Sequence, residues 1–158
     1  MRLYLVQHGE AVAEATDPDR PLTQRGRDEV HRTAVWLGHC GVQVQRVFHS
    51  GKTRARQTAE LLASSVCRKT APQTLNGIRP RDDLPPFLQE LSGWDKDTLV
   101  VGHLPFLAKV VTRLLCDREQ TPWVTFTPGT LVCLERVSEN GWTLRWMLPP
   151  ELAPACPG

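Results

Sequence analysis

Apolar residues in this chain occur in two patterns, short runs and longer stretches with helical spacing. Runs rich in branched and apolar residues predict strands, and we expect them at residues 3–6, 42–48, 73–75, 98–101, 124–126, 131–137 and 142–148. Apolar positions three to four apart predict helices at residues 24–38, 53–64, 86–91 and 106–116. Thr23 is a suitable N-cap for the first of these helices.

Strands that alternate with helices in this way predict an α/β fold. We expect a three-layer sandwich with a mostly parallel central sheet, helices on both faces and a late antiparallel hairpin. The dipeptide Asn140-Gly141 is a hairpin signal between the last two strands. Trp142 and Trp146 are four residues apart on the last strand, so we expect both to pack on one face.

The length of 158 residues suits one domain. We expect residues 1–150 to form it, and residues 151–158 to be a proline-rich tail, with fraying from Pro149 onward. Hydrophobic residues make up 41% of the chain and charged residues 23%, as in soluble globular proteins.

Charge and cysteine content exclude several classes of function. The net charge of +2, without a long basic run, argues against binding to nucleic acid or to an anionic membrane. No apolar stretch approaches the roughly 18 residues of a membrane span or forms a signal peptide, so we expect a cytoplasmic protein. The five cysteines include no C-x-x-C pair, which favours reduced thiols.

Polar residues that could take part in catalysis or ligand binding follow three of the predicted strands. Gln7, His8 and Gly9 follow the first strand, Ser50 and Arg54 lie between the second strand and its helix, and His103 follows the strand at 98–101. Ligands of open α/β sheets bind beyond the carboxyl ends of the strands. We therefore expect these residues to line one crevice.

Two histidines and an arginine suit a phosphoryl group better than a metal ion. They lack the thiolates or carboxylates and the spacing of most zinc sites, so no metal is expected. A guanidinium and imidazole donors match phosphoryl oxygens, and an unprotonated imidazole nitrogen can attack phosphorus. The amide of Gly9 is expected to face the anion, Ser50 to cap the helix, and Arg56 to be solvated or paired.

The motifs 5–9 (Leu-Val-Gln-His-Gly), 54–58 (Arg-Ala-Arg-Gln-Thr) and 101–103 (Val-Gly-His) resemble those of the histidine phosphatase superfamily. Residues 19–26 and 102–105, together with the short length, resemble the SixA-like phosphohistidine phosphatases within it. The resemblance implies a phosphoglycerate mutase-like fold, a phosphorylated His8, phosphoryl contacts from Arg54 and His103, and no cofactor or metal. It also implies a phosphohistidine-containing protein, such as a histidine phosphotransfer domain, or a small phosphorylated molecule as substrate.

One departure from the family concerns Gln7, where most members have arginine. Glutamine keeps an N–H donor but lacks the charge and the forked geometry. Arg20 is a candidate for the missing cation, and with Gln7, Gly9, Arg54 and His103 it completes the expected phosphate-binding set. The alternative is a catalytically impaired, phosphoryl-binding regulatory module.

The proton donor for a leaving group is a second open point. Asp82, Asp83 and Glu90 are candidates by position alone. An imidazole leaving group needs less help from an acid than an alkoxide does, so the lack of a clear acid agrees with a phosphohistidine substrate and also with a lack of catalysis. A mutase is less favoured because little chain is left for a lid.

Overall fold

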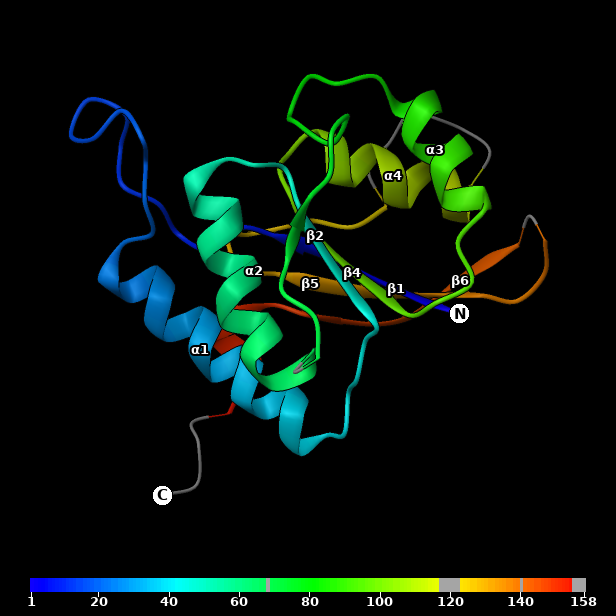
Figure 1. Ribbon diagram of the computed structural model, residues 1–158, viewed down its shortest axis with the longest axis horizontal. Coiled ribbons are helices and arrows are strands. Elements are labelled where there is room, and N and C mark those ends of the chain that lie inside the picture. Colours follow the sequence, from blue (N-terminus) through cyan, green and yellow to red (C-terminus); the bar gives the residue numbers. More distant parts are fainter. Residues whose placement is uncertain (68, 117–122, 140, 155–158) are drawn as a thin grey trace.

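A six-stranded sheet with the strand order β3-β2-β4-β1-β5-β6 runs through the centre of the molecule (Figure 1). The computed structural model describes residues 1–67, 69–116, 123–139 and 141–154. The neighbours β3/β2, β2/β4 and β4/β1 are parallel, whereas β1/β5 and β5/β6 are antiparallel. The strands are β1 (Arg2–Gln7), β2 (Arg46–His49), β3 (Gln73–Thr74), β4 (Thr98–Gly102), β5 (Leu131–Arg136) and β6 (Trp142–Leu148).

Helices cover both faces of this sheet, which confirms the predicted α/β sandwich. Figure 1 shows α1 (Gln24–His39) and α2 (Thr53–Val66) on one side, and α3 (Leu84–Ser92) and α4 (Phe106–Leu115) on the other. Thr23 caps α1 as expected, since its side chain accepts a hydrogen bond from the amide of Gly26. None of the described helices is long and apolar enough to cross a membrane.

The central strand β1 divides its side chains between two cores. Leu3 and Leu5 pack with α3 and α4, whereas Tyr4 and Val6 pack with α1 and α2. A strand covered on both faces buries every side chain, which explains the unbroken apolar run. Gln7 lies opposite Gly102 in the parallel register, so β1 and β4 end at the same level.

Several predicted elements differ from the structure. The strand expected at 42–48 begins only at Arg46, and residues 124–126 form no strand although Val124 and Phe126 are buried. The predicted fraying is wrong for Pro150–Leu152, a 3-10 helix whose Pro150 carbonyl accepts a hydrogen bond from Arg32 of α1. Residues 155–158 lie outside the described residues.

The predicted shared face of Trp142 and Trp146 is also wrong. The β5/β6 pairing passes from Cys133–Trp146 to Leu134–Leu144, which leaves Arg145 as an extra residue. Such a bulge reverses the alternation of side chains beyond it. Trp146 therefore packs beside Tyr4 in one core, and Trp142 packs against the other. The hairpin is present, while Asn140 of its predicted turn lies outside the described residues.

Candidate functional site

Three neighbouring strand ends bring the predicted site residues together. His8 and His103 leave β1 and β4 at one level, and their ring centroids lie 5.0 Å apart. Ser50 follows β2, which is the other neighbour of β4. Helix α2 then begins at Thr53, so that Arg54 in its first turn contacts His8.

His8 has a defined tautomer because each of its ring nitrogens has one partner. Nδ1 lies 2.8 Å from the carbonyl oxygen of Gly9, to which only an N–H can donate. Nε2 accepts a hydrogen bond of 3.1 Å from Nε of Arg54, so Nε2 carries a lone pair. Burial lowers the pKa of His8 to about 4, with the charges of Arg54 and Arg20 adding to the effect and the Gly9 hydrogen bond opposing it. The ring is therefore neutral at pH 7, with Nε2 available as a nucleophile.

Arg54 is only 8% exposed although it lies in the first turn of a helix. Its pKa is lowered, mainly by burial and then by the charge of Arg20, whereas Glu14 acts in the opposite direction. The carbonyl of Arg54 accepts a hydrogen bond from Thr58 Oγ1 within the helix. A buried guanidinium near a second cation is well placed to bind an anion.

His103 contacts a residue that the sequence assigned to a different role. Its Nε2 lies 2.5 Å from Oγ of Ser50, and both side chains are buried. The predicted helix cap is therefore wrong for Ser50, since Lys52 occupies the N-cap position of α2. Burial lowers the pKa of His103 to about 3, and the charges of His8, Arg54, Lys52 and Arg20 add to this effect in that order.

Gln7 and Gly9 have different surroundings from those expected. Within the described part of the chain, the buried Oε1 of Gln7 has no hydrogen-bond partner. The amide of Gly9, predicted to face an anion, instead donates to Thr58 Oγ1 at 3.0 Å. A Cβ at Gly9 would lie 2.8 Å from the side chain of Val30, so glycine permits the close approach of α1.

Arg20 lies close enough to the site for its charge to lower the pKa of His8, Arg54 and His103. It has a φ of +49°, in the left-handed region that is unusual for arginine. Its Nε donates to the carbonyl of Val12, and a bridge between Ala11 and Leu22 closes the loop that carries it. Strained residues held in this way concentrate at functional sites.

The three candidate acids lie on or beside α3. Asp82 accepts a hydrogen bond from the amide of Arg79, Asp83 occupies the N-cap position of α3, and Glu90 is exposed on that helix. The side chains whose charges shift the pKa of His8 and His103 are instead all basic residues. Among the described residues, no group of three or more His, Cys, Asp or Glu side chains is arranged to hold a metal ion.

Thr58 and Gly26 support the site and were not recognised from the sequence. The fully buried hydroxyl of Thr58 donates to the Arg54 carbonyl and accepts from the Gly9 amide, so it links α2 to the segment after His8. Gly26 lets α1 approach that same segment, because a Cβ there would lie 2.3 Å from the carbonyl oxygen of Glu10. The spacing of Thr58 four residues after Arg54 was the available signal.

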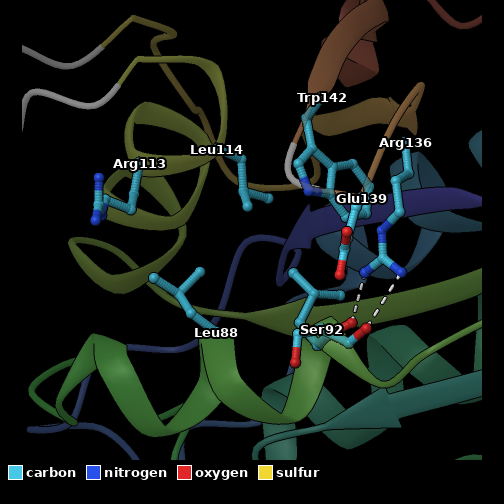
Figure 2. Close-up of a pocket in the computed structure, with 8 residues that line it drawn as sticks. Leu88, Ser92, Arg113, Leu114, Arg136, Glu139 and Trp142 are labelled. Atoms are coloured by element: carbon cyan, nitrogen blue, oxygen red, sulfur yellow. Dashed lines mark hydrogen bonds between the residues drawn. The ribbon is translucent and has the colours of Figure 1, made fainter.

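A separate pocket of about 300 Å³ lies between α3, α4 and the β5–β6 hairpin (Figure 2). Arg136 lies over the ring of Trp142 and donates hydrogen bonds to carbonyl groups at the end of α3, including that of Leu91. Carbonyl groups at a helix C-terminus lack partners within the helix, so this arginine stabilises that end. None of the residues that line the pocket belongs to the histidine site.

Comparisons with known proteins point to one family. Residues 3–82 match the model of the histidine phosphatase superfamily (branch 1). The chain is 32% identical to the phosphohistidine phosphatase SixA of Escherichia coli K12 over 155 residues, which cover 95% of this chain and 94% of that protein.

Solved structures agree with this match. A structure of the protein histidine phosphatase SixA complexed with tungstate aligns with a TM-score of 0.81 and 29% identity, covering 95% of this chain and 97% of the other. The α-ribazole phosphatase of Shigella flexneri, 19% identical, has the same fold with a TM-score of 0.71 and covers 92% of this chain and 95% of its own.

Proposed function

Because the chain belongs to the histidine phosphatase superfamily, we propose that it hydrolyses phosphoryl groups through a covalent intermediate on His8. The observation that carries the proposal is the state of the His8 ring. Nδ1 donates to the Gly9 carbonyl, the pKa is lowered to about 4, and Nε2 keeps a lone pair toward Arg54. A neutral, oriented imidazole is the form that attacks phosphorus.

The reaction has two displacements. In the first, the lone pair of His8 Nε2 forms a bond to phosphorus while the bond from phosphorus to the leaving group breaks, and the leaving group keeps that electron pair. In the second, the oxygen of water forms a bond to phosphorus, the electron pair of the P–N bond returns to Nε2, and both protons of the water leave with the inorganic phosphate. His8 needs no added proton to leave phosphorus, because Nδ1 keeps its hydrogen throughout and donates it to the Gly9 carbonyl.

Arg54, Arg20 and His103 provide positive charge for the phosphoryl oxygens. Phosphoryl transfer is accelerated mainly by positioning and by stabilising charge on the equatorial oxygens. A bound dianion raises the pKa of His103 from its low value, so His103 can become an imidazolium donor when the site is filled. Arg20 is the candidate for the charge that Gln7 lacks.

The favoured substrate is a phosphohistidine-containing protein, such as a histidine phosphotransfer domain, with a small phosphorylated molecule as the alternative. Two observations support this choice. The relative that is 32% identical, and that is matched over 94% of its length, is a phosphohistidine phosphatase. The candidate acids Asp82, Asp83 and Glu90 are not among the groups whose charges shift the pKa of His8 or His103. An imidazole leaving group needs little help from an acid. A cytoplasmic location and a single domain over residues 1–150 stay predictions of the sequence.

A regulatory module that binds phosphoryl groups without turnover is the second candidate. Gln7 favours it, since this position lacks the charge that most of the family has there, and no described residue donates a hydrogen bond to its buried Oε1. Such a module would keep Arg54 and His103 as ligands but would form little phosphohistidine.

Labelling of His8 separates the two candidates. We would incubate the protein with a phosphohistidine-containing domain and with phosphoramidate, quench in alkali to preserve P–N bonds, and map the phosphoryl group by mass spectrometry. We expect a label on His8 that also forms in the presence of chelator, with release of inorganic phosphate. His8→Ala should abolish both. Anion binding without label or phosphate release would establish the regulatory module instead.

A further inference from the structure

The second histidine of the site is buried, and only one of its ring nitrogens has a hydrogen-bond partner among the described residues. Nδ1 of His103 is buried and has no hydrogen-bond partner among the described residues. Nε2 lies 2.5 Å from Oγ of Ser50. His103 is 2% exposed and Ser50 is 3% exposed, so neither side chain can easily turn to solvent. For Nε2 of His103 to act on a phosphoryl group, it must act through Ser50 or lose this contact.

The choice of tautomer decides what the Ser50 hydroxyl can do. A buried N–H without an acceptor is rarer in proteins than a buried acceptor without a donor, which favours a bare Nδ1 and a proton on Nε2. Nε2–H then donates to Ser50 Oγ, and the hydroxyl hydrogen is free to donate elsewhere. Hydrogen bonds in such a chain strengthen one another.

Ser50 lies beside the residues of the proposed phosphoryl site. Ser50 follows β2 and lies four residues before Arg54, which contacts the nucleophilic Nε2 of His8. The two histidine rings lie 5.0 Å apart, and Ser50 contacts one of them, His103, from the third strand end. Lys52, Arg54 and Arg20, whose charges act on His103, all attract an anion into this space.

We propose that Ser50 is a phosphoryl-binding residue whose hydroxyl donates to a phosphoryl oxygen and is oriented by His103. The second histidine thus acts on the substrate through the chain Nε2–H to Ser50 Oγ–H to phosphoryl oxygen. This inference rests on the proposed function, since it assigns a further contact in the same site. The ligand class is a tetrahedral oxyanion, either free or as the phosphoryl group of a protein.

Binding of tungstate to the purified full chain tests the proposal, with affinity measured by calorimetry. Removal of a donor to a charged acceptor costs about 1.5–3 kcal/mol, so Ser50→Ala should weaken tungstate binding roughly 10-fold to 100-fold. Ser50→Thr keeps the hydroxyl and should recover most of this loss. Ser64→Ala, on the exposed side of α2, is the matched control and should leave the affinity unchanged.

The opposite model makes the opposite prediction. If Ser50 blocks Nε2 and must be displaced by the anion, Ser50→Ala should tighten binding. Tighter or unchanged binding overturns the proposal, as does a failure of Ser50→Thr to recover affinity. A ¹⁵N NMR spectrum of the histidines provides an independent readout, because a proton on Nδ1 rather than on Nε2 of His103 would also contradict it.

Arg54→Ala distinguishes failure of this inference from failure of the proposed function. If Arg54→Ala binds tungstate as tightly as the wild type does, the anion occupies another place and the proposed site itself is wrong. If Arg54→Ala loses binding while Ser50→Ala keeps it, the phosphoryl site stands and only the role of Ser50 is rejected.

Discussion

Nε of Arg54 donates a 3.1 Å hydrogen bond to Nε2 of His8, so the guanidinium touches the atom that we propose as the nucleophile. The contact has two consequences. It fixes the ring of His8 with the unprotonated Nε2 beside Arg54, and it places a positive charge where phosphoryl oxygens would arrive. The first turn of α2 therefore positions this charge beside the nucleophile, which follows β1.

Replacement of Arg54 by lysine tests whether the forked guanidinium is needed. Lysine keeps the charge but has neither the planar fork nor the fixed Nε contact, so we expect kcat/KM for an aryl phosphate to fall roughly 10-fold to 100-fold. Steady-state kinetics check the change. Arg56→Lys is the matched control, because Arg56 pairs with Glu60 at the surface and should change kcat/KM less than about threefold. Equal effects of the two substitutions would contradict the assignment of Arg54.

Gln7→Arg tests whether the missing charge limits turnover. A second guanidinium directed at the equatorial oxygens should raise kcat/KM toward an aryl phosphate by about 10-fold to 100-fold. If Arg20 already provides that charge, the two guanidinium groups repel each other, and the gain appears only in the Arg20→Ala background. A double-mutant cycle in one buffer separates the two cases. Additive effects would reject compensation by Arg20, and no gain in either background would reject a limiting role for Gln7.

The free energy of unfolding should depend on the two site histidines at acid pH. Folding lowers the pKa of His8 to about 4 and of His103 to about 3, from an ordinary value of about 6.5. The unfolded chain therefore binds more protons than the folded protein below about pH 6.5, and stability is lost as the pH falls from there toward about 3. Urea midpoints measured between pH 7.5 and 4.5 should fall accordingly.

Carboxylates also affect stability in acid, so the control compares how steeply the urea midpoint falls with pH in the wild type and in a variant without the two histidines. The His8→Ala/His103→Ala variant should lose less stability over the same pH range than the wild type. Saturating tungstate, which favours the protonated histidine rings, should also reduce the pH dependence of the unfolding free energy of the wild type. Identical slopes for the variant and the wild type would contradict the lowered pKa values.

Gly26→Ala should displace the segment that follows His8, although Gly26 itself lies on α1. The new Cβ would lie 2.3 Å from the backbone carbonyl of Glu10, so either α1 or the segment after His8 must move. Overpacking of this kind costs about 1–3 kcal/mol in unfolding free energy, and we expect lower activity with it. Gly38→Ala in the same helix meets Ser65 at 3.4 Å and should be neutral or slightly stabilising, by up to about 1 kcal/mol. Equal urea midpoints for the two variants would contradict the close approach at Gly26.

The sequence alone determined the layers of the fold and the three strand ends. The unbroken apolar run of β1 and the helical spacing of α1 are local patterns, because burial on both faces or on one face leaves a fixed periodicity. The end of each apolar run then placed His8 and His103 in one crevice, since parallel strands end on the same side of a sheet. Local patterns could not give the start of β2 at Arg46 or the absence of a strand at 124–126, because these depend on which neighbour offers a partner for the backbone.

Only the tertiary structure decided how the site is assembled. The Ser50–His103 and Gly9–Thr58 contacts join residues 53 and 49 positions apart, and both depend on the order of strands and on the docking of α2. Burial lowers the pKa of both histidines, and burial is a property of the whole packed core rather than of a motif. The bulge at Arg145 likewise moved Trp142 and Trp146 to opposite faces, since one extra residue in a strand changes a pairing that no short pattern encodes.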